Sequence, residues 1–237
     1  MAKYDRKIEL SERLSSVVSL VTKGGKVADV GCDHGFVSIY LVQRGIAERV
    51  IAMDVNKGPL ARAKEHVDDY GMGAYIELRL SDGLALVTKE DCVDTVVLAG
   101  MGGKLMEKIL SEALARELYI SELVLQPQSD LQSFRRFLRE NEYVITEEKM
   151  VFEEGKYYPM MKACYKGMRR EDVDYENMLS DAFGPCLLAD RHPVLHEFLL
   201  REIGKFEHII AEMEKRQSGD KEVTEKLEFL KRAEALF

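Results

Sequence analysis

Short apolar runs and longer runs with helical spacing alternate along most of this chain. Apolar runs at residues 27–30, 50–53, 75–80, 93–99 and 123–125 predict five strands. Apolar positions at helical spacing predict helices at about residues 8–22, 36–44, 59–70, 104–117 and 129–140. Strands that are apolar on both faces and separated by helices are typical of a parallel sheet covered on both sides. The pattern therefore predicts the α/β class.

The pattern changes twice after the fifth strand. Residues 143–152 and 156–165 flank the short turn EEG and predict an antiparallel strand pair at the end of the sheet. Residues 171–190 are mixed, and helical spacing returns at 193–216 and 223–237, joined by a polar turn at 217–220. Two such helices predict an antiparallel helical hairpin. We expect a first domain over residues 1–168 and a coiled-coil-like helical hairpin over 169–237.

Composition and charge exclude several classes of protein. Hydrophobic residues make up 46% and charged residues 32% of the chain, as in ordinary globular proteins. No uncharged apolar run approaches the roughly 18 residues that cross a bilayer, and the first residues have no apolar signal core. We therefore expect a cytoplasmic protein without a membrane segment. The net charge of −8 argues against a protein that coats nucleic acid nonspecifically.

The four cysteines, Cys32, Cys92, Cys164 and Cys186, are widely spaced and form no CxxC pair. This spacing predicts neither a zinc site nor a disulfide framework. We expect no metal, and we expect each cysteine to be a small buried or half-buried residue.

The most informative motif is DVGCDHG at residues 29–35, directly after the first strand. Ligands of open α/β sheets bind at the carboxyl ends of the strands. Gly31 lets the backbone turn sharply beside a ligand, and Gly35 permits close packing where the next helix begins. Asp33 stands where a pyrophosphate would approach a dinucleotide-binding turn, and its carboxylate suits a positively charged group such as the amino end of a methionine moiety.

Polar and glycine residues follow the next strands as well. Asp54 ends the second strand about 20 residues after the turn, where a carboxylate binds ribose hydroxyls or caps the next helix. Asp82 follows the third strand and can accept from an adenine amino group or cap a helix that Gly83 opens. Residues 100–103, GMGG, leave room for a ligand beside the backbone and open another helix. Residues 126–128, QPQ, offer amides for a base edge.

His34 is the strongest histidine candidate, because a histidine beside a ligand turn can act as a base or orient a substrate. A hydrogen bond within the turn explains it equally well. The other histidines lie on predicted helices or loops without evident partners, and we interpret them as structural or surface residues: His66, His192, His196 and His208.

Together these segments resemble the bacterial tRNA (adenine(22)-N(1))-methyltransferase family. The resemblance rests on DVGCDH at 29–34, GPL at 58–60, DGL at 82–84, LAGMGG at 98–103 and LQP at 125–127, in this order and spacing. It covers nearly the whole chain, including the helical hairpin. Asp54 is a departure, since family members can have Glu there, but the carboxylate is retained.

The resemblance implies a Rossmann-type class I fold and methyl transfer from S-adenosyl-L-methionine to N1 of adenine 22 in tRNA. It implies a cofactor site and a base pocket in this chain. The cofactor residues are Asp29, Gly31, Asp33, Asp54, Asp82, Gly83, Gly100, Met101 and Gly102. The residues that border the base are Asp33, His34 and Gln126.

Two questions stay open at this point. The tRNA surface could use any of three basic stripes: Lys3, Arg6, Lys7 and Arg13; Arg135, Arg136 and Arg139; or Lys166, Arg169 and Arg170. Other functions also fit the fold, namely a methyltransferase for another substrate, a nicotinamide-dinucleotide oxidoreductase, or a non-enzymatic nucleotide-binding scaffold. The missing NPPY-type loop after the fourth strand argues against an exocyclic amino methyltransferase, and Asp33 argues against the oxidoreductase.

Overall fold

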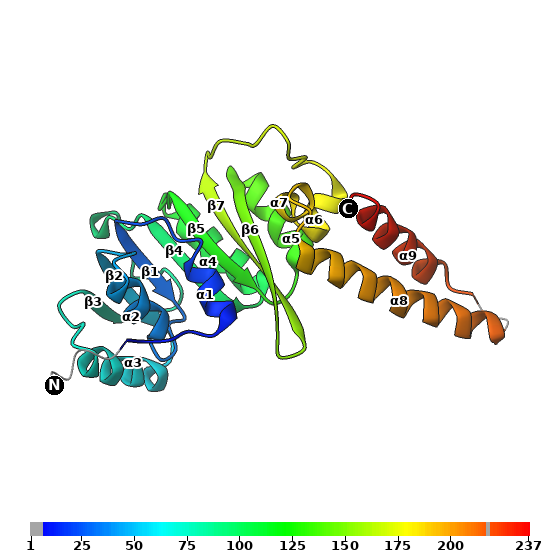
Figure 1. Cartoon of the computed structure of the whole chain (residues 1–237). Helices are drawn as coiled ribbons and strands as arrows, with labels where there is room; N and C mark the ends of the chain where they lie inside the picture. The colour runs from blue at the N-terminus through cyan, green and yellow to red at the C-terminus, as the bar shows by residue number, and fades with distance from the viewer. Residues whose placement is uncertain (1–6, 217–218) are drawn as a thin grey trace.

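A central sheet of seven strands organises the protein, described here by a computed structural model over residues 7–216 and 219–237 (Figure 1). The strands are β1 (Lys26–Val30), β2 (Arg49–Asp54), β3 (Ile76–Leu80), β4 (Thr95–Met101), β5 (Glu122–Pro127), β6 (Tyr143–Glu153) and β7 (Lys156–Tyr165). Their order is β3-β2-β1-β4-β5-β7-β6. β1 to β5 pair in parallel, and β7 is antiparallel to both β5 and β6. The predicted α/β fold, a parallel sheet finished by an antiparallel pair, is confirmed.

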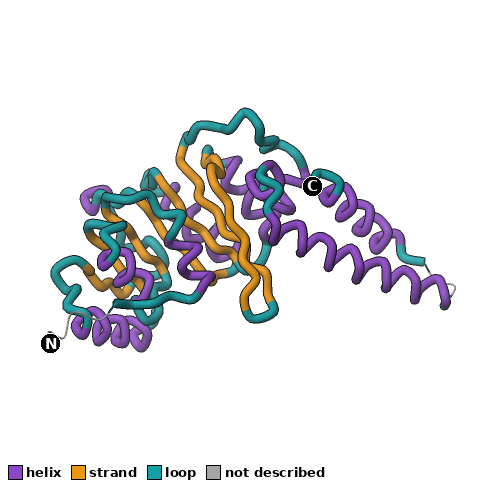
Figure 2. Tube along the Cα trace, in the orientation of Figure 1, coloured by secondary structure: helices purple, strands orange, loops and turns teal. Residues whose placement is uncertain are grey.

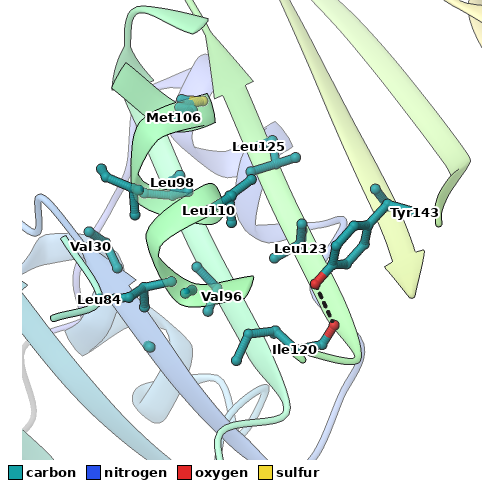
Figure 3. Packing of buried hydrophobic residues seen from close by; sticks show 14 of the residues in the cluster. Val30, Leu84, Val96, Leu98, Met106, Leu110, Ile120, Leu123, Leu125 and Tyr143 are labelled. Atoms are coloured by element: carbon teal, nitrogen blue, oxygen red, sulfur yellow. Dashed lines mark hydrogen bonds between the residues drawn. The ribbon is translucent and has the colours of Figure 1, made fainter. Parts of the chain in front are cut away.

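Helices cover both faces of the sheet (Figure 2). They are α1 (Glu12–Val18), α2 (Phe36–Gln43), α3 (Lys57–Asp69), α4 (Gly103–Ala115) and α5 (Leu131–Glu140), with a 3-10 turn η1 (Lys89–Asp91). Buried residues of α1, α2 and α3 pack on one face. Those of α4 and α5 pack on the other. Figure 3 shows Met106 and Leu110 of α4 lying against Leu98 and Leu125, so the two faces have separate apolar cores.

Strand order reverses between β1 and β4, which are neighbours in the sheet although two strands separate them in the sequence. Ligands of such sheets bind beside this reversal, at the carboxyl ends of the strands. β6 runs parallel to β5, because each is antiparallel to β7, so the β6–β7 turn lies at this same edge. The backbone N–H of Arg13 donates to Glu153 at that turn, 3.0 Å away, and so ties α1 to the edge.

The C-terminal segment forms α6 (Met178–Phe183), α7 (Pro185–Ala189), α8 (Pro193–Lys215) and α9 (Lys221–Glu234). Their apolar residues form a third cluster, which also includes Met150 of β6. In Figure 1, α8 and α9 project from the end of the sheet that β6 forms. The predicted helical hairpin is present, although residues 217 and 218 of its turn lie outside the described residues. The division at residue 168 stays a prediction.

Two sequence expectations about helices were wrong. The first helix covers Glu12–Val18 instead of residues 8–22, because the Ser11 hydroxyl accepts from the N–H of Leu14 and starts the helix there. Ile8 precedes the helix, outside any regular element, and is buried, with its N–H donating to Gln43. Gly83 does not open a helix either. Its φ of 55° places it in a turn, and no α-helix occurs between β3 and β4.

The cysteine expectations were mostly confirmed. Cys32 and Cys186 are buried and Cys164 is half-buried, but Cys92 is exposed, because its φ of 51° ends the turn η1 at the surface. Within residues 7–216 and 219–237 no helix is long and apolar enough to span a membrane. The same residues contain no cluster of His, Cys, Asp and Glu suited to a metal ion.

A candidate active site at the carboxyl edge of the sheet

The turn between β1 and α2 has the sharp backbone path that its glycines predict. Gly31 and Gly35 both have φ of 74°, and Asp33 between them has φ of 47°. The N–H groups of Gly31 and Cys32 donate to the carbonyl of Met53 on β2, at 2.8 and 2.9 Å. The turn is therefore fixed by the neighbouring strand and does not depend on a ligand for its shape.

Both glycines of this turn are also required for close contact. A Cβ on Gly35 would lie 3.1 Å from the Cβ of Ala63, so Gly35 lets α2 pack closely on α3 as predicted. A Cβ on Gly31 would overlap the end of the Met101 side chain. Met101 thus lies over Gly31, and the turn after β1 meets the loop after β4 across the strand-order reversal.

Asp29, the last but one residue of β1, is a buried carboxylate. Its side chain accepts a hydrogen bond from the hydroxyl of Ser38 at 2.6 Å, and no ion pair to it exists among the described residues. Burial raises the pKa of Asp29 to about 6, and the nearby carboxylate of Asp54 adds to the rise. A cationic ligand at this point would relieve both effects.

Two further acidic residues follow β2 and β3. Asp54 is buried, and its carboxylate accepts from the N–H of Asn56 at 2.8 Å, just before α3 begins. The N–H of Ser81 donates to the carbonyl of Asp54 at 3.0 Å, so the ends of β2 and β3 lie together. Asp82 comes next and is exposed. The sequence-predicted carboxylates therefore lie along one edge of the sheet, from Asp29 to Asp82.

The glycines of the loop after β4 have different tasks. Gly100 has φ of 77° at a shift in the β4–β5 register, and a Cβ there would meet only the amide of Gln128, at 3.8 Å. A Cβ on Gly103 would lie 2.6 Å from the carbonyl oxygen of Ser129. Gly100 thus leaves space beside the backbone, as predicted, whereas Gly103 is required for packing against the loop between β5 and α5.

The start of α1, the turn after β1 and the loop after β4 enclose a cleft of about 360 Å³ at the reversal of strand order, and Asp54 and Asp82 lie outside its lining. Two of its lining residues, Asp33 and His34, were predicted to border a base. The side chain of Asp33 is 69% exposed and that of His34 is 33% exposed, and His34 Nε2 lies 3.6 Å from Asp33 Oδ1. The lining residues are Arg13, Leu14, Asp29, Gly31, Cys32, Asp33, His34, Phe36, Val37, Ala99, Gly100, Met101 and Gln128.

Gln126 does not line this cleft, contrary to the prediction from the sequence. Its side chain is fully buried, accepts from the guanidinium of Arg13 at 2.9 Å and donates to the carbonyl of Pro127 at 3.3 Å. Arg13 stands between Gln126 and the cleft, with its guanidinium also over the Tyr158 ring. Gln126 can therefore act on a ligand only through Arg13, and Arg13 is the cation that sequence reasoning had assigned to a surface stripe.

The thiol of Cys32 is an unsuitable nucleophile, although it lines the cleft. Burial and the negative charges of Asp29 and Asp54 raise the pKa of Cys32 far above its usual range. The thiol therefore stays protonated at neutral pH and serves as an apolar part of the wall.

The stripe of three arginines on α5 is not a free basic surface. Arg135 is 2% exposed, pairs with Glu148 at 3.0 Å and donates to the carbonyl of Asp181 at 3.1 Å. Arg139 pairs with the Asp181 carboxylate at 2.5 Å, and Arg136, 49% exposed, lies 3.6 Å from it. These contacts hold the C-terminal helices against α5 and β6, so the expectation of an RNA-facing stripe was wrong for Arg135.

The other two stripes have different outcomes. Lys3 and Arg6 lie outside the described residues. Arg169 and Arg170 pair with acids within the C-terminal segment: Arg169 with Glu176 at 2.9 Å, and Arg170 with Asp172 and Asp190, each at 2.7 Å. Their positive charges are therefore largely compensated.

Three of the remaining histidines have partners that the sequence did not reveal. The ring of His66 on α3 contacts the carbonyl of His34 at 2.9 Å. His192 caps α8 by accepting from the N–H of Val194 at 3.3 Å, and burial lowers its pKa. His196 lies 3.4 Å from Glu234 and stacks on Phe237. The structural interpretation holds for His192 and His196, but His66 lies beside the cleft.

Comparison with known proteins identifies the family of this chain. The methyltransferase-domain family matches residues 10–161. The chain is 29% identical over 233 residues to the tRNA (adenine(22)-N(1))-methyltransferase of Bacillus subtilis, covering 94% of this chain and 96% of that protein. It is 33% identical over 182 residues to a putative tRNA methyltransferase of Mycoplasma pneumoniae, covering 76% and 81%.

A solved structure extends the likeness to the whole fold. The putative tRNA (m1A22) methyltransferase of Streptococcus pneumoniae, crystallised with S-adenosyl-L-methionine, superimposes with a TM-score of 0.82 at 31% identity, over 95% of this chain and 100% of that one. The likeness thus extends beyond residues 10–161 to most of the C-terminal segment. The chain belongs to the methyltransferase-domain family and, within it, to the bacterial tRNA (adenine(22)-N(1))-methyltransferases.

Proposed function

We propose that this chain transfers a methyl group from S-adenosyl-L-methionine to N1 of adenine 22 in tRNA. The observation that carries the proposal is the acid-lined cleft at the reversal of strand order, whose buried carboxylate Asp29 has no cation partner among the described residues. A methyltransferase that uses this donor needs a site for a sulfonium and an amino group, and such a cleft suits both. Membership of the family adds tRNA as the substrate.

Residues of the cleft and of the adjoining strand ends fit the donor in type: Asp29 and Asp33 line the cleft, whereas Asp54 and Asp82 follow at the ends of the next strands. Asp29 and Asp33 would face its positively charged end, Asp54 its ribose hydroxyls and Asp82 its adenine amino group. Gly100 leaves space for it beside the backbone, since a Cβ there would meet only the amide of Gln128 at 3.8 Å, whereas the space beside Gly31 holds the Met101 side chain. The full set we propose for the donor is Asp29, Gly31, Asp33, Asp54, Asp82, Gly83, Gly100, Met101 and Gly102.

The donor supplies the methyl group as the electrophilic substituent of a sulfonium. N1 of adenine attacks with its own lone pair and carries no proton, so the protein needs no general base for this step. Positive charge moves from the sulfonium to the adenine ring as the N–C bond forms and the S–C bond breaks. A carboxylate of the cleft such as Asp33 would stabilise that charge throughout the transfer.

Asp33 and His34 have a second task, which is to position the base. The Asp33 side chain is exposed and that of His34 is half-buried, both line the cleft, and both can hydrogen-bond to an adenine edge. Gln126 acts behind them by holding Arg13. Because N1 is occupied by pairing in a duplex, the adenine has to be unpaired or drawn out of its stack before it reaches these groups.

We assign the reaction to residues 1–168 and a supporting role in RNA recognition to residues 169–237. Arg135 donates to the carbonyl of Asp181 at 3.1 Å and Glu148 accepts from the N–H of Cys186 at 2.9 Å, which fixes the second segment to the first, so the α8–α9 hairpin can present a fixed shape to the RNA. The hairpin pairs many of its own charges, for example Lys231 with Glu207 at 2.7 Å, which suits recognition of shape better than a general attraction to phosphate. We propose a cytoplasmic location because tRNA is the substrate.

The test is transfer of labelled methyl from S-adenosyl-L-methionine to bulk tRNA, followed by nucleoside analysis and mapping of the modified position. We expect N1-methyladenosine at position 22, and no label in a transcript with guanine at that position. Label at another position or in another nucleoside would reject the assignment. Binding of the donor without transfer to any RNA would favour a nucleotide-binding scaffold.

The Asp33→Ala variant tests the site itself, with donor binding and methyl transfer measured separately. Loss of transfer is expected from a residue that faces both donor and base. Intact transfer would remove Asp33 from the site. A thermal-shift comparison of S-adenosyl-L-methionine with NAD checks the class of cofactor at low cost.

A further inference from the structure

Three aromatic rings lie together at the mouth of the cleft, and neither the donor site nor the transfer step accounts for them. They belong to His34 in the glycine turn, Phe36 at the start of α2 and His66 on α3. The ring centroids of Phe36 and His66 are 4.6 Å apart, and each lies 5.8 Å from that of His34. The ring of Phe36 is inclined by only 13° to that of His34 and 21° to that of His66, so Phe36 stacks on both histidines, whereas the two histidine rings are tilted by 34° to each other.

The backbone holds this ring cluster in place. A ring nitrogen of His66, Nδ1, lies 2.9 Å from the carbonyl oxygen of His34. A carbonyl oxygen can only accept, so Nδ1 carries the proton and donates. The tight contact of Gly35 with Ala63 brings α2 and α3 close enough for this bond. The rings are therefore preorganised and need no rearrangement before they meet a ligand.

The ring cluster is open to solvent on the side of the cleft. His34 and Phe36 both line the cleft, and Phe36 is 37% exposed although it is a large apolar residue. A ring required only to pack α2 on α3 would bury its faces. An exposed Phe36 ring, stacked on two half-buried histidine rings beside a polar cleft, instead suits a flat ligand that stacks.

Charge makes stacking especially useful to this protein. The chain has a net charge of −8, and the cleft is lined by the acidic residues Asp29 and Asp33 and by Arg13, whose guanidinium is engaged by Gln126 and Glu153. Attraction of phosphates, which provides much of the affinity of nucleic-acid proteins, is therefore weak at the place where the base has to enter. Aromatic side chains bind bases through their faces without needing positive charge.

We propose that His34, Phe36 and His66 form a stacking platform for an unpaired base of the acceptor RNA at the mouth of the cleft. This inference rests on the proposed function and deepens it, because it names how an acidic active site holds an RNA base. Phe36 provides the ring face, and His66 is a positioning residue that fixes the turn beneath it.

The test compares Phe36→Leu, which keeps the apolar volume and removes the ring, with Phe36→Tyr, which keeps the ring. We expect Phe36→Leu to lower kcat/KM for tRNA by roughly tenfold, the loss typical of one base–aromatic stack, and Phe36→Tyr to restore it. Donor binding, measured by calorimetry, should stay within about twofold of wild type in both variants. The loss should be equal at low and high salt, because stacking releases no counterions.

Tyr119→Leu is the matched control. Tyr119 is also exposed, at 53%, and stacked, with its ring 5.0 Å from that of Tyr165, but it precedes β5 and lies at the opposite edge of the sheet. Its replacement should leave kcat/KM for tRNA unchanged. A wild-type rate for Phe36→Leu would overturn the platform. Equal weakening of donor binding and tRNA transfer would also overturn it, since the rings would then belong to the donor site.

The wild-type protein in the same assay separates the two proposals. Failure of the wild type to methylate tRNA rejects the proposed function. Methylation by the wild type and an equal rate for Phe36→Leu reject the platform alone. Circular dichroism and thermal unfolding of each variant confirm that a loss of transfer is not a loss of fold.

Discussion

Asp29 and Glu148 are two buried carboxylates on strands of the same sheet, and their surroundings are opposite. Burial raises the pKa of both. Glu148 faces the guanidinium of Arg135 at 3.0 Å and accepts from the N–H of Cys186 at 2.9 Å. Asp29 instead accepts a hydrogen bond from the hydroxyl of Ser38, and the nearby carboxylate of Asp54 repels its negative charge.

The difference separates a charge that serves the fold from one that serves a ligand. Glu148 is compensated within the chain, and it joins β6 to the C-terminal helices. Asp29 is left uncompensated at the end of β1, where the cleft opens, so the folded chain bears an electrostatic cost that a cationic ligand can remove. The comparison predicts that neutralising Glu148 destabilises the protein and that neutralising Asp29 does not.

Glu148→Gln is expected to have the largest effect. The amide keeps the shape of the side chain but leaves the Arg135 guanidinium buried without a counter-charge. We expect the free energy of unfolding to fall by about 3–5 kcal/mol, measured by urea denaturation. Glu147→Gln is the control, because Glu147 is 49% exposed and 3.7 Å from Lys149, and it should change little. A loss below about 1 kcal/mol would mean that the pair is not essential to the junction.

Asp29→Asn should stabilise the unliganded protein above neutral pH. Because the pKa of Asp29 rises from 3.8 to about 6 on folding, the folded protein loses stability as pH increases through that range. Its ionisation then costs the folded state about 3 kcal/mol near pH 7.5 and roughly half of that near pH 5. The variant should recover this difference in urea denaturation, while the oxygen of the introduced amide still accepts from Ser38. An unchanged or lower free energy of unfolding at both pH values would contradict the comparison.

The same substitution should weaken donor binding by roughly tenfold, because a charged partner is replaced by a neutral amide. In the wild type, affinity for S-adenosyl-L-methionine should fall as pH drops below about 6, since Asp29 becomes protonated there. Calorimetry at several pH values measures this, and the dependence should vanish in Asp29→Asn. S-adenosylhomocysteine keeps the amino group of the donor but has no sulfonium. If Asp29→Asn weakens binding of both compounds equally, the amino group is the partner of Asp29. If it weakens S-adenosylhomocysteine binding less, the sulfonium is the partner. A wild-type affinity that is flat across pH 6 would contradict the role of Asp29.

The fold was predictable because it depends on local patterns. Apolar runs such as those of β1 and β4 and the helical spacing between strands indicate a buried parallel sheet without knowledge of distant contacts. The glycine turn was predictable for the same reason, because Gly31 and Gly35 sit where a strand ends and a helix begins. These are properties of adjacent residues, and the sequence displays them directly.

The errors concern contacts between distant residues. Arg135 looked like part of a solvated basic stripe, but its partners Glu148 and Asp181 lie 13 and 46 residues further along the chain. Arg13 contacts Gln126 although 113 residues separate them in the sequence. Arg13 therefore lines the cleft in place of Gln126, although the sequence pattern had placed Arg13 in a surface stripe. Helical spacing shows which residues share a face, but it does not show what that face meets.

The ring cluster was hidden in the same way. His66 is separated from His34 by 32 residues, and nothing in its local sequence distinguishes it from a surface histidine. Only the close approach of α2 and α3, which Gly35 and Ala63 permit, brings the two together. In the sequence, Phe36 is indistinguishable from an ordinary apolar residue at the start of a helix.

The smallest expected effect is that of Arg136→Ala, which tests whether any of the α5 stripe serves RNA. Arg136 is half exposed and lies 3.6 Å from Asp181, whose carboxylate Arg139 already neutralises. We expect the free energy of unfolding to change by less than about 0.5 kcal/mol, because exposed ion pairs contribute little. The slope of log affinity for tRNA against log salt should also stay unchanged, as filter binding over a range of salt concentrations can show. A slope smaller by about one would mean that Arg136 neutralises a phosphate. In that case α5 would have one arginine for the fold and one for the RNA, and the contrast between Glu148 and Asp29 would recur between adjacent residues of a single helix.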